Sequence, residues 1–368
     1  MRRVVLIAGA VVAALLLATA CDPRQLATAT QSAVRLHPPS TTPTPVAGAA
    51  PSDQGAAPAP APGMDHGLMP MINGALIPAR GTVNYTGPRQ QAQIYPIKPG
   101  DGTGAFRIST NYSHFSYDDP IVYPGQPGRA HLHVFFGNRC TDAFTTDPAA
   151  CPSSASDGGT LNKTAYWVPA VIDTATGAPI QPDVMQVYYK TGYGGVQPSQ
   201  VQPFPAGLRI VAGDMSRTTP EPGPDYSHVT IWECDNGNGG SFDHLPTNCA
   251  PGTWLVMAVE FPQCWDGVHL DSPDHKSHMA YPVNGGCPAS HPVPLPEITQ
   301  RAIYTVPRSG TSTWRLSSDN YSGPAGYSAH ADWFDGWDQA TMQQWLNTCD
   351  RAAVDCQMDL LGNGQMVY

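Results

Sequence analysis

Several short motifs that mark common enzyme classes are missing from this sequence of 368 residues. No H-E-x-x-H segment occurs, which excludes the usual zinc peptidase arrangement. No G-x-S-x-G segment occurs, so the nucleophile turn of α/β-hydrolases is absent. The absence of a P-loop and of G-x-G-x-x-G argues against nucleotide-binding folds. No C-x-x-C pair occurs, which argues against a zinc ribbon or a thioredoxin-type redox site.

Charged side chains are also scarce. Only 13% of the residues are Asp, Glu, Lys or Arg, and the formal net charge is −10. Removal of Arg2 and Arg3 with a leader would bring that charge to −12. An acidic, sparsely charged surface does not attract phosphates, so we expect no nucleic-acid partner.

The only long apolar run lies near the N-terminus. Arg2 and Arg3 precede 14 apolar residues at positions 4–17, and Ala-Thr-Ala at 18–20 precedes Cys21. The run is short for a membrane span and typical of a signal peptide, which we predict over residues 1–20. Cys21 is then either a free thiol or a lipidation site. We favour lipidation, although Leu17 stands four residues before the cysteine instead of three; the membrane is then contacted only through the lipid.

Eight cysteines remain when Cys21 is set aside, an even number that suits four disulfides in an exported protein. We expect neighbours along the chain to pair and to close local loops, although eight cysteines allow 105 connectivities. These cysteines are Cys140, Cys151, Cys234, Cys249, Cys264, Cys287, Cys349 and Cys356.

The composition divides the rest of the chain in two. Residues 21–74 are rich in Pro, Ala and Thr, and such a segment cannot bury enough apolar surface to fold. We interpret it as a disordered linker that follows the lipid anchor. Residues 75–368 contain no further linker-like stretch, and we expect a single β-rich domain there.

Short runs rich in Val, Tyr, Trp and Ile, separated by Gly and Pro clusters, predict strands in this domain. No long helical pattern alternates with them, so we expect a mainly β fold: an antiparallel β-sandwich with long disulfide-linked loops and one C-terminal helix. The strands are expected at 105–110, 130–136, 165–172, 184–189, 208–212, 229–233, 254–261, 301–306 and 312–316. The helix should begin after Asp338, and it must end between Cys349 and Cys356 if these two pair.

Histidines and acidic residues gather in two places. His131 and His133 lie in a strand-like run, where side-chain alternation puts both on one face. Their spacing allows them to chelate one metal ion or to hydrogen-bond neighbouring loops. The stretch 261–298 holds His269, Asp271 and the segment 274–278 (DHKSH). It is compatible with a metal site, an acid/base pair or a hydrogen-bonded loop scaffold, and His291 and His330 with Asp332 are candidates to join the same site.

Five segments resemble the domain-of-unknown-function family 1996, found in secreted proteins of fungi and actinobacteria. They are DPIVYPGQPGRAHLHVFFG (119–137), KTAYWVP (163–169), FPAGLRIVAGD (204–214), 261–294 and GYSAHADWFDGWD (326–338). The resemblance implies an extracellular β-rich domain without an established activity, and a carbohydrate context by association. The polar residues it carries over are His131, His133, Lys163, Tyr166, Arg209, Asp214, Trp265, Asp266, Asp274, His275, Lys276, His278, Tyr281, His330 and Asp332.

Three functions are compatible with these features. The working hypothesis is recognition or processing of an envelope polysaccharide at a cleft rich in His, Asp and Lys, with a cell-wall polysaccharide as partner. Trp167, Trp265 and Trp337 are then candidates to stack on sugars, although Trp167 suits a core better. The alternatives are a non-catalytic wall- or metal-binding protein and a metal-dependent hydrolase or oxidase.

The candidate catalytic residues are His131, His133, Lys163, Tyr166, Arg209, Asp274, His275, Lys276, His278 and His330. The candidate cofactor is one divalent metal ion held by residues from the set His131, His133, His278 and His330.

Overall fold

The computed structural model describes residues 69–92, 100, 102–192, 194–223, 229–235, 240–320 and 323–368, all within one unit that spans 49–368. The predicted signal peptide, the lipidation site Cys21 and most of the predicted linker lie outside the described residues. Among the helices that the structure describes, none is both long and apolar enough to cross a membrane.

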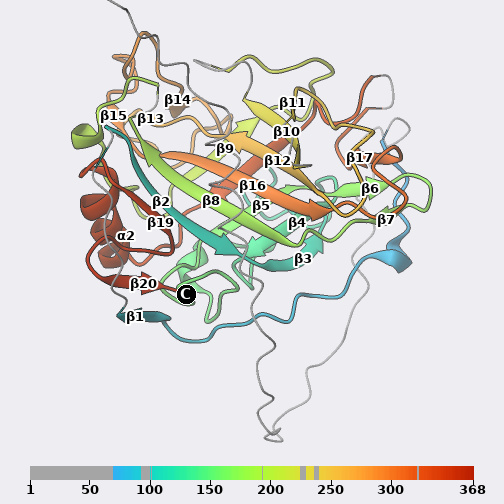
Figure 1. The fold of residues 1–368 in the computed structure, drawn as a ribbon, viewed down its shortest axis with the longest axis horizontal. Coiled ribbons are helices and arrows are strands. Elements are labelled where there is room, and N and C mark those ends of the chain that lie inside the picture. Colours follow the sequence, from blue (N-terminus) through green and yellow to red (C-terminus); the bar gives the residue numbers. More distant parts are fainter. Residues whose placement is uncertain are drawn as a thin grey trace, which may run out of the picture. The chain divides into compact units, whose positions relative to one another are not determined.

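A seven-stranded sheet forms one layer of the fold (Figure 1). Its strands pair antiparallel except for the last two in the order, which are parallel. In order, they are β11 (Gly240–Phe242), β10 (Thr230–Asp235), β12 (Trp254–Glu260), β16 (Glu297–Thr305), β8 (Val184–Thr191), β2 (Gly104–Thr110) and β19 (Asp355–Met358).

A five-stranded, fully antiparallel sheet forms the second layer. Its strands are, in order, β3 (Tyr112–Ser116), β4 (His133–Gly137), β5 (Ala165–Pro169), β18 (His330–Phe334) and β9 (Arg209–Gly213).

The two sheets share one hydrophobic core. Val187 of β8, Val134 of β4 and Trp333 of β18 belong to the same buried cluster. Hydrogen bonds also cross the interface: for example, Gln300 Nε2 donates to the Asp332 carbonyl oxygen at 2.8 Å, and the hydroxyls of Tyr166 and Tyr189 are 2.9 Å apart. The predicted mainly β, sandwich-like architecture is therefore confirmed.

Smaller elements extend the sandwich. A three-stranded sheet joins β14 (Met279–Ala280), β13 (Cys264–Trp265) and β15 (Val293–Pro294), and a second joins β17 (Trp314–Leu316), β6 (Val171–Asp173) and β7 (Ala178–Pro179). The strands β1 (Gln90–Ala92) and β20 (Gln365–Val367) pair with each other. Three 3₁₀ turns occur in the described chain, at η2 (Gly74–Leu76), η3 (Pro148–Ala150) and η4 (Pro198–Gln200).

Four disulfides join cysteines that are neighbours along the chain, which confirms the predicted pairing. The bonds are Cys140–Cys151, Cys234–Cys249, Cys264–Cys287 and Cys349–Cys356. Four disulfides in one domain indicate an oxidising, extracytoplasmic environment.

The C-terminal helix begins and ends as its sequence requires. The Asp338 carboxylate accepts a hydrogen bond from the Thr341 backbone N–H at 2.9 Å and caps α2 (Gln339–Trp345). A π turn, η5 (Leu346–Asp350), ends the helix before Cys356, so the last disulfide can close. Ala353 lies beyond the helix with a φ of 54°.

Two predicted strands differ from the structure in an informative way. The run 165–172 is divided, because β5 belongs to the five-stranded sheet and β6 to a separate one. The run 130–136 enters its sheet only at His133, since β4 begins there. Two of the five strands in the second sheet, β3 and β18, were not predicted.

Candidate functional site

The outer face of the five-stranded sheet, turned away from the shared core, carries the polar cluster. On β18, Ala331 and Trp333 point into the core, so alternation puts His330 and Asp332 on the opposite face. On β4, the same alternation puts His133 and Phe135 on that face. A second apolar cluster, which includes Phe135, Trp167 and Phe334, surrounds the polar groups.

Three imidazoles meet on this face. The ring nitrogens that His131, His133 and His330 can offer to an ion all lie within 4.8 Å of one another. The Nε2 atoms of His133 and His330 are 3.5 Å apart. Two nitrogen ligands at about 2.0–2.1 Å from one tetrahedral ion lie roughly 3.3–3.4 Å apart. The spacing of these two nitrogens therefore suits a shared metal ion.

Hydrogen bonds fix the proton positions on two of the rings. Nδ1 of His133 lies 3.0 Å from the Asp118 carbonyl oxygen, and Nδ1 of His330 lies 2.8 Å from the Ser328 carbonyl oxygen. A carbonyl only accepts, so Nδ1–H donates in both rings. Burial lowers the pKa of each ring to about 4, which keeps both neutral near pH 7. Two Nε2 lone pairs then face each other, as in metal-binding histidines.

His131 has no hydrogen-bond partner for either ring nitrogen among the described residues, although only 4% of the residue is exposed. Burial, followed by the nearby His133 and His330, lowers its pKa well below the usual value. A buried polar group without a partner costs about 1–3 kcal/mol. A cation among the three rings would satisfy the nitrogen of His131 that carries the lone pair.

Two carboxyl groups complete the cluster. Asp332 is fully buried, and neither of its oxygens has a hydrogen-bond partner in the described chain. Burial, and then the nearby Asp119, raises its pKa well above the usual value. Asp119 accepts hydrogen bonds on Oδ1 from the backbone N–H groups of Ile121 and Val122, at 2.9 and 2.8 Å. Ligand atoms of Asp119, His133 and Asp332 also lie within 4.8 Å of one another.

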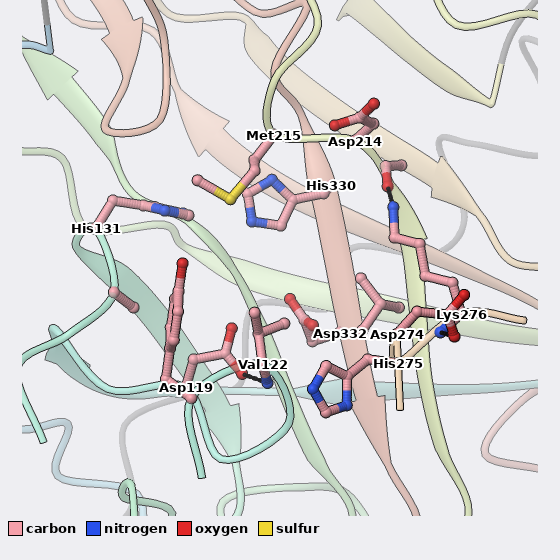
Figure 2. A pocket seen from close by; sticks show the side chains of 14 residues that line it. Asp119, Val122, His131, Asp214, Met215, Asp274, His275, Lys276, His330 and Asp332 are labelled. Carbon is pink, nitrogen blue, oxygen red and sulfur yellow. Dashed lines mark hydrogen bonds between the residues drawn. The ribbon is translucent and has the colours of Figure 1, made fainter. Parts of the chain in front are cut away.

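A cavity of about 220 Å³ opens onto the cluster (Figure 2). Its wall is formed by Asp119, Val122, Tyr123, Ala130, His131, Val211, Gly213, Asp214, Met215, Asp274, His275, Lys276, His330 and Asp332. Gly213 must lack a side chain, because a Cβ there would lie 2.5 Å from the Ala329 carbonyl oxygen and 2.8 Å from the His330 Cα. The close approach of β9 to β18 at this point therefore depends on glycine.

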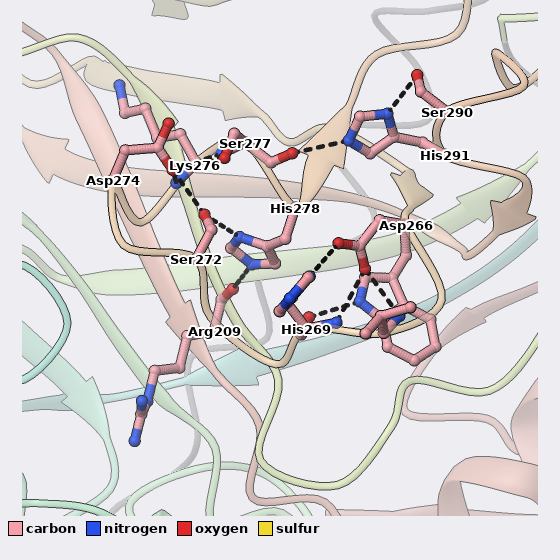
Figure 3. Close-up of polar contacts among 12 residues, drawn as sticks. Arg209, Asp266, His269, Ser272, Asp274, Lys276, Ser277, His278, Ser290 and His291 are labelled. Atoms are coloured by element: carbon pink, nitrogen blue, oxygen red, sulfur yellow. Dashed lines mark hydrogen bonds and ion pairs between the residues drawn. The ribbon is translucent and has the colours of Figure 1, made fainter.

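The stretch 264–294, closed by Cys264–Cys287, supplies another side of the cavity, and most of its histidines are tied by hydrogen bonds (Figure 3). His278 bonds the Ser272 hydroxyl through Nδ1 at 2.9 Å and the Arg209 carbonyl oxygen through Nε2 at 2.7 Å. His291 bonds the Ser290 hydroxyl and the Ser277 carbonyl oxygen. The structure thus gives His278 scaffold contacts and does not bring it to the three-histidine cluster.

Hydrogen bonds also order the acidic residues of this stretch. The hydroxyl of Ser272 donates to Asp274 at 2.7 Å, and this bond is the main cause that lowers the pKa of Asp274. Burial raises the pKa of Asp266, but the hydrogen bonds that it accepts from His269 Nδ1 at 2.6 Å and from the backbone N–H groups of His269 and Val268 together lower that pKa to about 2. Both carboxylates therefore hold the loop in their ionised form.

Other candidate residues lie away from the cavity. Lys163 donates to the Ala149 carbonyl oxygen. Tyr166 is buried between the sheets, where desolvation raises the pKa of its hydroxyl well above the usual value. Arg209 forms an ion pair with Asp271 at 3.3 Å and stacks on Phe334.

The candidate tryptophans are mostly buried. Trp167 and Trp337 are 0% and 3% exposed, so neither offers a ring face to a sugar at the surface. Trp265 is partly exposed and donates to the His269 carbonyl oxygen at 2.7 Å. Of the three, only Trp265 is placed to contact a ligand from solution.

Sequence reasoning missed several cavity residues, among them Asp119 and Met215. Asp332 was named as a candidate to join the site, but the strand that carries it was not predicted. Its strand, HADWF, alternates polar and apolar residues over five positions, and that period would have placed His330 and Asp332 on one face.

Fold and site together define a disulfide-linked β-sandwich with a buried histidine–aspartate cluster beneath a small cavity. The chain belongs to the family described as Domain of unknown function (DUF1996), whose model matches residues 119–337. No curated protein and no solved structure matches the chain. The family assignment that the sequence motifs suggested is therefore confirmed.

Proposed function

We propose that this chain is an exported metal-binding protein in which His131, His133 and His330 hold one first-row divalent metal ion. The observation that carries the proposal is the group of three neutral, buried imidazoles whose ring nitrogens lie within 4.8 Å of one another. Neutral imidazole suits zinc, copper, iron and nickel. Asp332 and Asp119 supply carboxylate oxygens beside the rings.

A metal ion at this place would polarise a carbonyl group or a bound water facing the cavity, the chemistry of metal-dependent hydrolases. The backbone carbonyls of Asp118 and Ser328 hold the Nδ1 protons of His133 and His330 and keep both Nε2 atoms turned toward the ion. The cavity gives a small substrate group access to the cluster. This arrangement favours the metal-dependent hydrolase among the functions that the sequence allows.

Elemental analysis of the natively exported protein tests the metal centre. We expect close to one equivalent of metal in the wild type, and its loss in His131→Ala and His133→Ala. His291→Ala is the matched control, because His291 lies in the same chain with both ring nitrogens bonded to Ser290 and Ser277. A wild-type protein that contains no metal and takes up none on titration would remove the proposal.

A copper-dependent oxidase is the second candidate, favoured by Met215. Its thioether lines the same cavity as His131 and His330, and Figure 2 draws it near both rings. Thioether sulfur is a soft ligand that selects copper over zinc. Weaker Cu(I) binding with unchanged Zn²⁺ binding in Met215→Leu would support this candidate, and equal Cu(I) binding would remove it.

We include a lipid anchor and a wall-polysaccharide partner in the same proposal. Cys21 carries a lipid, and the chain acts at the cell surface on a wall polysaccharide or a substituent of one. The N-terminal pattern at 2–21 supports the anchor. Cys21→Ser should move the protein from the membrane fraction to the medium, and an unchanged distribution would leave a freely secreted protein.

A further inference from the structure

His275, a histidine of the cavity wall, pairs with an aspartate of the same loop. His275 Nδ1 lies 3.0 and 3.1 Å from the two carboxylate oxygens of Asp271. Arg209 Nη1 lies 3.3 Å from Asp271 Oδ2 and holds that carboxylate from its other side. A carboxylate accepts, so Nδ1–H donates to it and Nε2 carries the basic lone pair of the neutral ring. Nε2 has no hydrogen-bond partner within the described part of the chain.

The backbone at His275 is held in an uncommon conformation. Its φ is 60°, in the left-handed region that few residues other than glycine adopt without cost. Hydrogen bonds from the neighbouring residues maintain it: the His275 N–H donates to the Ser272 carbonyl oxygen at 2.8 Å, and Lys276 Nζ donates to the Gly213 carbonyl oxygen at 2.5 Å. Such strain is concentrated at functional positions. Here it places the ring in the cavity wall with Asp332 (Figure 2).

A second histidine–aspartate pair in the same loop shows that not every such pair lies at the cavity. His269 Nδ1 lies 2.6 Å from Asp266 Oδ2, a shorter contact than in the His275 pair. The His269 side chain is 59% exposed and is not part of the cavity wall, whereas that of His275 is 22% exposed and is. A loop scaffold alone explains His269. It does not explain a strained histidine that keeps a ring nitrogen available beside a group of metal-binding side chains.

We propose that His275 is the general base and acid of a hydrolytic reaction at this cavity, with Asp271 as the residue that orients it. This inference rests on the proposed metal centre. The cavity of about 220 Å³ is below the range of roughly 300–1,000 Å³ that holds a drug-sized ligand. The substrate class is therefore a small acyl ester, such as an acetyl substituent of a larger molecule that stays outside the cavity.

The step is balanced without any further reactant. Water attacks the ester carbonyl carbon and forms the new C–O bond, while His275 Nε2 takes one proton from that water. The bond from the carbonyl carbon to the alcohol oxygen breaks, and His275 returns the proton to the leaving oxygen. One ester and one water give one carboxylic acid and one alcohol. Asp271 stabilises the imidazolium that exists between the two proton transfers.

The test uses the full exported chain loaded with zinc and 4-nitrophenyl acetate as the probe. His275→Asn is the variant, because asparagine tolerates a positive φ better than most residues. His269→Asn is the matched control. We expect equal zinc content in the wild type and both variants, and a zinc-dependent rate about 100-fold lower in His275→Asn alone. Asp271→Asn should lower the rate with the zinc content unchanged.

Chemical rescue separates a catalytic role from a structural one. In His275→Gly the left-handed backbone is retained and the ring is removed, so added imidazole should restore part of the zinc-dependent rate. If zinc does not bind the wild type, the proposed metal centre fails and this inference fails with it. If zinc binds and the wild type does not hydrolyse the ester, or His275→Asn is as fast as His269→Asn, the metal centre stands and the role of His275 is overturned.

Discussion

The histidine cluster on the five-stranded sheet differs from two histidines of the disulfide-closed loop, His278 and His291, in the state of the ring nitrogens. In the loop, His278 and His291 have a partner for both nitrogens. On the sheet face, His133 and His330 share one short contact between lone pairs, and His131 has no partner among the described residues. Both regions are rich in histidine, so composition does not distinguish a scaffold from a ligand site. Hydrogen-bond satisfaction does.

Metal removal should give the largest effect and would sharpen this comparison. An ion bound only by the folded state stabilises it by about 4 kcal/mol at a free concentration 1,000 times the dissociation constant. We expect a chelator to lower the unfolding temperature of the wild type and of His291→Ala alike, and to leave that of His131→Ala unchanged. Calorimetry with and without chelator measures the difference. An equal shift in all three proteins would contradict a metal held by the sheet histidines.

His114 tests whether a histidine becomes a metal ligand because it lies on the five-stranded sheet or because its ring nitrogens lack hydrogen-bond partners. It lies on β3, fully buried, with Nδ1 2.9 Å from the Ser113 hydroxyl and Nε2 3.0 Å from the Thr141 carbonyl oxygen. Burial lowers its pKa to about 3, below the ordinary value of about 6.5. The folded state therefore binds fewer protons than the unfolded state, and stability present above pH 6.5 is lost as the pH falls toward 3.

Between pH 7 and 4, metal-free wild type should lose roughly 3 kcal/mol more unfolding free energy than His114→Gln. Urea unfolding at a series of pH values measures this difference in unfolding free energy. The sheet cluster is the same in both proteins, so its titration cancels in the difference. His114→Gln should also keep the full metal content. Parallel pH curves for the two proteins would show that burial of His114 does not set the acid sensitivity.

Two loop histidines, His278 and His291, should differ by a smaller amount in their contribution to the unfolding free energy. His278→Ala removes the ring that bonds the Arg209 carbonyl oxygen and leaves the Ser272 hydroxyl with Asp274 as its remaining partner, and we expect a cost of about 2 kcal/mol in unfolding free energy. His291 is only partly buried, so His291→Ala should cost about 0.5 kcal/mol or less. Chemical denaturation of the two variants gives both values. If His278→Ala instead changed the metal content with no loss of stability, His278 would be a metal ligand and not part of the loop scaffold.

The sequence predicts the frame of this fold well, because its signals are local. The eight cysteines pair with their neighbours, Asp338 caps the helix, and seven of the nine strand segments expected from apolar runs overlap a single strand of similar position. Alternation along the run that contains His131 and His133 places both rings on one face. Each of these features depends on residues within about two dozen positions of one another.

The candidate site was only partly predictable, since it is assembled from distant strands. β18 is short and carries His330 and Asp332 where a buried strand normally carries apolar residues, so its five positions gave no strand prediction. Its place between β5 and β9 then decides which histidine joins His131 and His133. The sequence offered both His278 and His330 as further ligands, but the ring nitrogens of His278 are bonded to Ser272 and Arg209. Only the spatial neighbours of each ring separate the two.

The order of the disulfides has a consequence for export. Each cysteine bonds to the next one along the chain, and the two members of a bond are separated by 7 to 23 residues. A chain that crosses a membrane from its N-terminus delivers each pair to the oxidising side in succession, with the earlier pairs already joined. An oxidase that links cysteines in their order of arrival would therefore make the native set, without a later exchange of partners.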